Sequence, residues 1–313
     1  MRERFEYASA WIVLKFLGCL PHRMARTLGA MVANSLFFMR PPLRRAAEFN
    51  LRLAFPELPG LARRHILRSM VRNLGWLAAE FARLPRYNRS NIEKVMILDG
   101  FENFAAAERR GKGVLFLTGH LGAWELEPFA HAIYSSPIYF LARPIDNPYV
   151  DGLVNRYRGA SGNRPIKKNE SARSILRILH EGGVIGVLAD QNTLPAEAVF
   201  VDFFGIPAAT TSGIARLARR TGAAVVPAYN YWDSQIRKYV LRYEPALELI
   251  ATEDEQGDIH NFSARFNRVI EDYVRRFPDQ WVWVHRRWKT RPANESAIYP
   301  DEQREYANQT RSD

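Results

Sequence analysis

The stretch GVLFLTGHLGAWELE, residues 113–127, contains the transition on which the predicted fold depends. It begins as an apolar run of the length expected for a buried strand, turns at Gly119 and His120, and continues as a short amphipathic helix. The turn places a histidine at the end of the strand, and a glutamate, Glu125, follows it five positions later. The function of this pair is the first question that the sequence raises.

On one continuous helix, five positions would rotate His120 and Glu125 about 140° apart, so the two side chains would face away from each other. Gly119 and Gly122 instead let the chain turn, which places His120 at the carboxyl end of the strand and Glu125 in the first turn of the helix. Ligands of open α/β sheets bind at that edge. We therefore expect the carboxylate to orient the imidazole by a hydrogen bond to one ring nitrogen, leaving the other free as a base. The alternative is a structural histidine that caps the turn.

Strand-like runs alternate with helical ones along most of the chain, which predicts an α/β fold with a mostly parallel sheet flanked by helices. Residues 43–95 and 258–278 have helical spacing of their apolar positions. We predict apolar helices over residues 1–42, one α/β domain over 43–292 and a polar, mobile tail over 293–313. The expected strands cover residues 113–119, 137–142, 183–190, 223–232 and 238–249, and the helices between them cover 123–134, 148–160, 171–182 and 212–222.

The N-terminal part consists of two apolar segments, residues 7–20 and 24–39, which Lys15 and Arg26 interrupt. A spanning helix needs about 20 uninterrupted apolar residues, and neither segment supplies them. We predict a membrane-associated helical hairpin that lies in or on the bilayer; a pair of ordinary core helices and a single tilted span are the alternatives. The arginines expected to meet lipid phosphates are Arg23, Arg26, Arg40, Arg44 and Arg45.

Composition narrows the choice of partners. The chain has 313 residues and a net charge of +11, which favours a polyanionic partner such as nucleic acid, an anionic membrane or an acidic carrier protein. Its single cysteine, Cys19, excludes an internal disulfide and a cysteine-based zinc site, and it favours a reducing compartment. No secretory cleavage signature follows the first apolar run, so we expect a retained protein.

Five blocks in one order carry a resemblance to a known family. HLGAWE, LARPIDNPYVD, LADQN, VFVDFFGIPAATTSG and WVWVHRRWKTRP have the order and approximate spacing of the late lipid A biosynthesis acyltransferases. That family is a branch of the glycerolipid acyltransferase superfamily with the H-x4-D/E motif. The resemblance extends from the N-terminus to about Pro292, and the R-P-x-D-N-P and H-R-R-W-K-T-R-P blocks are its most specific parts.

The resemblance implies a glycerol-3-phosphate acyltransferase-like fold and transfer of a fatty acyl chain. The donor would be an acyl carrier protein thioester. The acceptor would be a hydroxyl of a lipid A precursor, which is an anionic glycolipid. The reaction would take place at the cytoplasmic face of the inner membrane. His120 would be the general base and Glu125 its partner. A lysophospholipid acyltransferase and a glycolipid (mannoside) acyltransferase on the same fold are the alternatives.

Three further residues are predicted to bind substrate. Arg143 matches the arginine of the second block, which is expected to hold a phosphate or polarise the thioester; the alternative is a surface ion pair with Asp146. Asp190 and Gln191 follow a strand-like run and are expected at the same edge. Some members of the family have a second acidic residue at the position of Asn192 in this chain. The resemblance therefore does not imply a pair of carboxylates acting together at this block.

The sequence lacks the motifs of two other kinds of catalytic site. No G-x-S-x-G elbow is present, which disfavours an acyl-serine intermediate, and no H-E-x-x-H pair indicates a metal. We therefore expect direct transfer without metal or cofactor.

The basic run over residues 285–291, interleaved with Trp281, Trp283 and Trp288, predicts an interfacial patch for anionic lipid or an acidic carrier. Nucleic-acid stacking is the other interpretation of that run, but a nucleic-acid binder would leave the apolar segments and the H-x4-E block unexplained.

Overall fold

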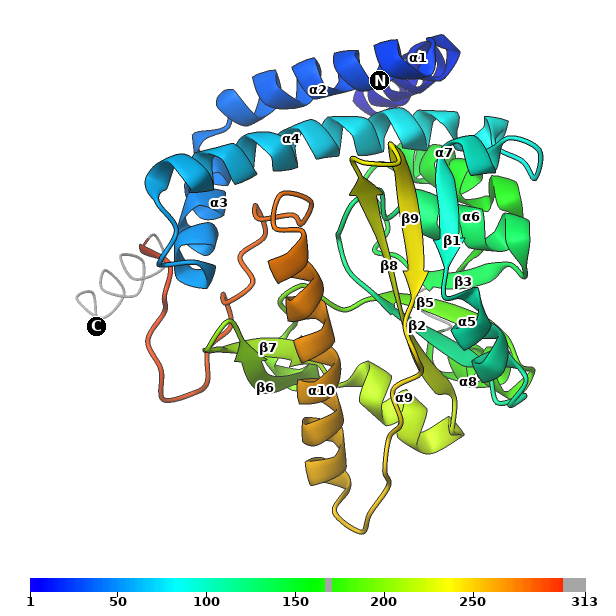
Figure 1. Cartoon of the computed structure of the whole chain (residues 1–313), viewed down its shortest axis with the longest axis vertical. Coiled ribbons are helices and arrows are strands. Elements are labelled where there is room, and N and C mark those ends of the chain that lie inside the picture. The colour runs from blue at the N-terminus through cyan, green and yellow to red at the C-terminus, as the bar shows by residue number, and fades with distance from the viewer. Residues whose placement is uncertain (167–170, 301–313) are drawn as a thin grey trace.

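A seven-stranded sheet organises the computed structural model, which describes residues 1–166 and 171–300 (Figure 1). The strand order is β1-β9-β8-β2-β5-β3-β4, and every neighbouring pair is parallel except β8 and β9. The predicted α/β fold with a mostly parallel sheet is confirmed. The strands are β1 (Met96–Asp99), β2 (Val114–Thr118), β3 (Ile138–Leu141), β4 (Arg164–Ile166), β5 (Val184–Leu188), β8 (Ala224–Asp233) and β9 (Lys238–Tyr243).

Strand β2 is buried along its whole length because helices cover both faces of the sheet. Val114 and Phe116 point into one core, and Leu115 and Leu117 into the other. In Figure 1, α5 and α6 lie on one side of the sheet, and α9 and α10 lie on the other. The helices of this part are α5 (Phe101–Glu108), α6 (Leu126–Tyr134), α7 (Pro148–Arg158), α8 (Ser171–His180), α9 (Gly213–Thr221) and α10 (Glu255–Arg276). Short 3₁₀ turns are η1 (Leu84–Arg86), η2 (Ile92–Lys94), η3 (Gly159–Ser161) and η5 (Pro195–Glu197).

Four helices, α1 (Arg2–Cys19), α2 (His22–Phe38), α3 (Pro41–Ala54) and α4 (Gly60–Arg83), precede the sheet. The long α4 crosses the end of the sheet, and α2 packs along it (Figure 1). The two backbones approach closely at Gly29 and Gly75, where a Cβ on either residue would overlap the other's backbone. Among residues 1–166 and 171–300, no helix combines the length and apolar character that crossing a bilayer requires.

The outward sides of α1 and α2 nevertheless expose large apolar side chains, which we call the N-terminal apolar surface. Its members are Phe5, Trp11, Ile12, Val13, Phe16, Met24, Met31, Val32, Leu36 and Phe38. Arg26, expected to meet lipid phosphates, points inward instead. Its guanidinium lies 2.6 Å from the buried carboxylate of Glu80, which also contacts His22 and accepts a hydrogen bond from Tyr87. A buried carboxylate needs these partners, and they fasten α2 to α4.

The block VFVDFFGIPAATTSG forms a two-stranded antiparallel hairpin of β6 (Ala198–Phe203) and β7 (Ile206–Thr211). Its two-residue turn, Phe204 and Gly205, has φ values of 57° and 76°. Left-handed residues at both turn positions suit a tight hairpin. The hairpin packs against α10, apart from the main sheet.

The aromatic residues of the predicted interfacial patch at residues 281–291 are not at the surface, although Lys289 of its basic run is exposed. Trp281, Trp283 and Trp288 are at most 1% exposed and belong to the core between the hairpin and the sheet. Arg287 is fully buried, and its guanidinium donates to the Ala209 carbonyl and the Thr210 hydroxyl. The prediction was wrong for the aromatic residues. A sequence in which aromatic and basic residues alternate does not show which of the two kinds of side chain packs into the core.

The predicted polar tail begins with ordered structure. Tyr299 is buried, packs its ring at a tilt against Phe49 and donates its hydroxyl hydrogen to Asn50 Oδ1. This contact joins Tyr299, a residue of the predicted tail, to α3. Residues 301–313 of the predicted tail lie outside the described residues.

Replacing Gly75 with alanine should destabilise the fold by about 1–3 kcal/mol, because the added methyl group would force α2 away from α4. Thermal unfolding measures this loss. Gly152→Ala is the matched control, since Gly152 also lies in a helix but faces open space, and there alanine should stabilise by up to about 1 kcal/mol. Equal effects of the two substitutions would contradict the proposed close packing.

Candidate active site

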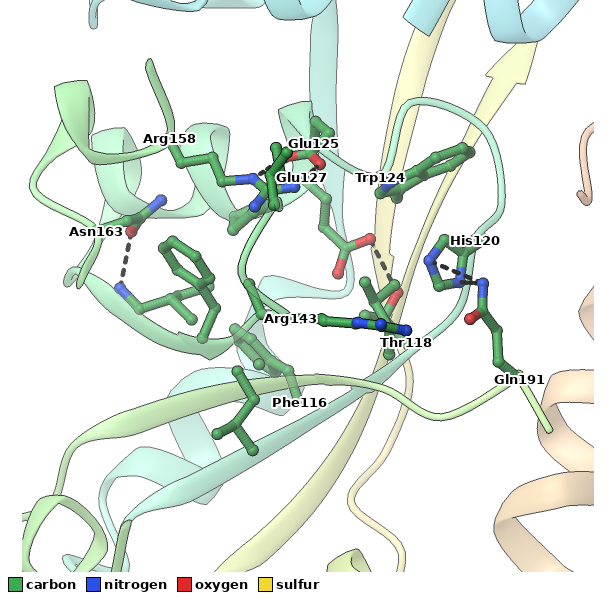
Figure 2. Close-up of a pocket in the computed structure, with 18 residues that line it drawn as sticks. Phe116, Thr118, His120, Trp124, Glu125, Glu127, Arg143, Arg158, Asn163 and Gln191 are labelled. Carbon is green, nitrogen blue, oxygen red and sulfur yellow. Dashed lines mark hydrogen bonds and ion pairs between the residues drawn. The ribbon is translucent and has the colours of Figure 1, made fainter. Parts of the chain in front are cut away.

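A cavity of about 350 Å³ opens at the carboxyl ends of β2, β3 and β5 (Figure 2). This is the sheet edge at which the sequence places its candidate residues, and parallel strands bring their carboxyl ends together there. The apolar lining consists of Phe116, Trp124, Pro128, Ile138, Phe140, Leu141, Ala142, Ile145 and Leu188, and the polar lining includes Thr118, His120, Glu125, Glu127, Arg143, Arg158, Asn163 and Gln191. A cavity lined by both apolar and polar side chains suits a ligand that has an apolar part and polar groups.

His120 lies directly after β2 and is held by Asp190, which follows β5. The imidazole Nδ1 is 2.8 Å from Asp190 Oδ1, and the His120 backbone N–H donates to Asp190 Oδ2 at 2.8 Å. Trp281 Nε1 donates to the same Oδ2 at 2.7 Å. Gly119 leaves the space for this arrangement, because a Cβ there would come within 3.2 Å of the Asp190 carboxylate.

The charge of Asp190 determines the protonation of the pair. Burial lowers the pKa of His120, but the Asp190 carboxylate and, more weakly, Glu125 outweigh burial and leave this pKa above its ordinary value. Burial raises the pKa of Asp190, but its hydrogen bonds and the nearby imidazole bring it to about 2. Asp190 is therefore charged at neutral pH and accepts the Nδ1 proton, which leaves Nε2 free to accept another.

Glu125 does not make the hydrogen bond to His120 that the spacing predicts. Its carboxylate forms a two-point ion pair with Arg158 of α7, with Nε to Oε2 at 2.8 Å and Nη2 to Oε1 at 2.5 Å. Figure 2 shows this pair on the opposite side of the cavity from the imidazole. Asp190, expected to face substrate, takes the orienting position behind the ring and is only 1% exposed. The two acids have thus exchanged the places that sequence reasoning assigned to them.

Arg143 and Gln191 both line the cavity, as expected. The Gln191 amide nitrogen lies 3.3 Å from both ring nitrogens of His120, so this amide sits against the imidazole. Arg143 is exposed and points into the cavity from the loop after β3 (Figure 2). Within the described part of the chain no ion pair joins it to Asp146 or to another carboxylate. Its positive charge is thus available to a ligand.

Sequence reasoning missed three residues of this site: Arg158, Glu127 and Trp281. Arg158 lies 33 residues beyond Glu125 and Trp281 lies 91 residues beyond Asp190, so no local spacing indicates either contact. Glu127 had a local signal, since it is an acid within the apolar start of α6. Its side chain is buried, and burial raises its pKa to about 8 although the Thr118 hydroxyl donates to it. No cluster of three His, Cys, Asp or Glu side chains suited to a metal ion occurs among residues 1–166 and 171–300.

The sequence comparisons with known proteins point to one family. The family model for bacterial lipid A biosynthesis acyltransferases matches residues 3–290. The lipid A biosynthesis palmitoleoyltransferase of Escherichia coli (strain K12) is 28% identical over 284 residues, covering 90% of each chain. The lauroyltransferase of the same organism is 28% identical over 304 residues, covering 92% of each. The crystal structure of a 1-acyl-sn-glycerophosphate acyltransferase from Thermotoga maritima aligns with a TM-score of 0.35 and 14% identity, covering 74% of this chain and 95% of the other.

Asp190→Asn should lower the pKa of His120, because the variant loses the charge that outweighs burial. Proton NMR titration of the imidazole measures this, with His120→Gln identifying the resonance. Asp202→Asn is the matched control, since that carboxylate accepts a hydrogen bond from the Gly205 N–H in the hairpin turn and should leave the His120 pKa unchanged. An unchanged His120 pKa in Asp190→Asn would refute the assigned partnership.

Proposed function

The chain belongs to the bacterial lipid A biosynthesis acyltransferase family and is an acyltransferase, and we propose that it moves a fatty acyl chain from an acyl carrier protein thioester to a hydroxyl of a lipid A precursor. The observation that carries this proposal is the His120–Asp190 pair at the wall of an apolar cavity. A hydroxyl is a poor nucleophile near neutral pH and needs a positioned base, whereas the acyl chain needs an apolar site.

The proposed step is a direct transfer. As the acceptor oxygen attacks the thioester carbonyl carbon, His120 Nε2 takes the hydroxyl proton, displacing the amide of Gln191 from the ring. The carbon–sulfur bond then breaks, and the imidazolium returns the proton to the departing thiolate of the carrier. Asp190 stabilises the imidazolium and holds its orientation through the Nδ1 hydrogen bond.

Two charged groups support this step from the other walls. Arg143 points into the cavity and suits either the oxyanion that develops on the carbonyl oxygen or a phosphate of the acceptor. Glu125 favours the charged imidazole through space, and its ion pair with Arg158 holds the start of α6 against α7. In this proposal Glu125 supports catalysis by charge and position, and Asp190 is the group bonded to the ring.

The N-terminal apolar surface supports a place on the membrane. It exposes apolar side chains along α1 and α2, and Arg23 and Arg40 are exposed beside them. Such a surface suits helices that lie in the headgroup region, with the arginines facing anionic lipid. We propose attachment to the cytoplasmic face of the inner membrane, where the carrier protein and the lipid precursor would meet.

An acyl-transfer assay tests the reaction. Vesicles containing the protein should transfer an acyl chain from an acyl carrier thioester to a lipid A precursor. Mass spectrometry of the product measures this transfer. His120→Ala should reduce the initial rate about 100-fold to 10,000-fold, the range expected for a positioned base. His260→Ala is the control, because His260 is an exposed histidine of α10. Transfer to lysophospholipid or a mannoside in place of the lipid A precursor would contradict the proposed acceptor, and full activity of folded His120→Ala would exclude the mechanism.

Attachment to the membrane is tested by flotation with anionic vesicles. The wild-type protein should float with the vesicles in high salt and be released by detergent, because apolar burial is insensitive to salt whereas charge attraction is screened. Trp11→Asp with Phe16→Asp should weaken flotation. Ile250→Asp is the control, since Ile250 is also apolar and is more exposed than Trp11 and Phe16 but lies in the loop between β9 and α10. Complete release of the wild type by salt alone would contradict the proposed insertion.

A further inference from the structure

The block HRRWKTRP, residues 285–292, has no role in the proposed mechanism, yet it contacts the loop after β5. Two of its residues, His285 and Thr290, bond to Asn192, which lies two residues after Asp190. The Asn192 backbone N–H donates to His285 Nε2 at 2.9 Å. The Thr290 N–H donates to Asn192 Oδ1 at 2.9 Å, and Asn192 Nδ2 donates to Thr290 Oγ1 at 3.0 Å. These hydrogen bonds join the block to the loop that contains Asp190.

His285 is itself fixed from the other side. Asn50 of α3 is fully buried, and its amide donates to the backbone carbonyls of Trp283 and His285, each at 2.7 Å. Because His285 Nε2 accepts the Asn192 N–H, this nitrogen is unprotonated and the ring is neutral. Burial favours the same state, since it lowers the pKa of His285 to about 4. The ring is thus an uncharged hydrogen-bond acceptor whose backbone is held by α3.

The loop at residues 190–192 is therefore anchored at both ends, while its middle residue faces the cavity. Asp190 bonds to His120, and Asn192 bonds to the C-terminal block. Between them, the Gln191 side chain lies against the imidazole (Figure 2). The proposed step requires the Gln191 amide to leave the ring. Anchors on either side let this side chain move while the Asp190 carboxylate keeps its position.

We propose that His285 is a positioning residue that keeps the Asp190 carboxylate bonded to His120. It acts through Asn192, and the C-terminal block thereby becomes part of the active site. This inference rests on the proposed function, because it takes His120 to be the base. Without an acceptor at position 285, the Asn192 N–H would need another partner and the loop would shift. A displacement of a catalytic group by about 1 Å can cost about 100-fold in rate.

NMR titration of His120 tests the positioning without any reaction. His285 is uncharged near neutral pH, so replacing it removes no charge, and a change in the His120 pKa reports a change in geometry. His285→Leu has a similar volume but no acceptor. In this variant the His120 pKa should fall, in the same direction as in Asp190→Asn but by less, because the carboxylate keeps its charge. His285→Gln should keep the wild-type value, since its amide oxygen accepts the same N–H.

Initial rates test the same inference in the reaction. His285→Leu should lower kcat about 10-fold to 100-fold and leave KM for donor and acceptor unchanged, whereas His285→Gln should retain most of kcat. In the Asp190→Asn background His285→Leu should lower kcat little further, because the two residues act through one hydrogen bond. His22→Leu is the matched control. This half-buried histidine of α2 bonds to Glu80 at 2.7 Å, and its loss should leave kcat unchanged.

Thr290→Val is a milder second variant for the case that His285→Leu does not fold, which circular dichroism and thermal unfolding would show. It removes the hydroxyl that bonds to Asn192 Nδ2, and it should lower kcat and the His120 pKa by less than His285→Leu. An unchanged His120 pKa in both folded variants would overturn the inference, as would a full additional loss of kcat in the Asp190→Asn background.

The two measurements separate this inference from the proposed reaction. A lowered His120 pKa in His285→Leu, in a protein that transfers no acyl chain, would support the positioning and contradict the proposed function. Acyl transfer by the wild type with full kcat in folded His285→Leu would support the function and overturn the positioning.

Discussion

The buried carboxylate of Asp190 is the constraint on which the site depends. A charge that is 1% exposed is tolerated only when hydrogen bonds replace its hydration, and here three N–H groups do so. They come from the backbone and ring of His120 and from the indole of Trp281. The carboxylate thus joins the ends of β2 and β5 to the C-terminal part of the chain, which also forms a bridge between Leu121 and Trp281. One interaction therefore orients the histidine and positions the segment that closes the core.

The C-terminal segment illustrates how packing converts a basic, aromatic sequence into interior. Trp283 packs against Phe55 at the end of α3 and Phe204 of the hairpin turn, and Trp288 packs against Phe203. Arg287 lies in the same core and donates to carbonyl and hydroxyl oxygens. Buried guanidinium groups need such partners, and burial lowers the pKa of Arg287 to about 10. The net positive charge of the chain therefore does not show how much positive charge is exposed in this C-terminal segment. Exposed cations such as Arg23 and Arg40 lie on or beside the N-terminal helices.

The N-terminal helices also contact the cavity wall. Asn147 follows Arg143 in the same loop, caps α7 through its side-chain oxygen, and donates from its amide to the Glu3 carbonyl and the Glu6 carboxylate of α1. Helix α7 in turn carries Arg158 to Glu125. A continuous set of contacts therefore leads from the outermost helix to two walls of the cavity. The apolar helices are structurally part of the acyltransferase fold, whatever surface they meet on their outer side.

The stretch 113–127 by itself determined a strand, a turn and a helix, because burial along β2, the glycines and the amphipathic spacing are local signals. It also determined that His120 lies at the sheet edge where ligands bind, and the flanking blocks indicated the family. Only the tertiary structure decided the partner of His120. Asp190 is 70 residues away in sequence and becomes adjacent because β2 and β5 are neighbours in the sheet, whereas the nearer Glu125 is taken by Arg158. Packing between distant segments sets the order of the strands and decides which side chains face inward. The spacing of residues in a motif contains no information about either.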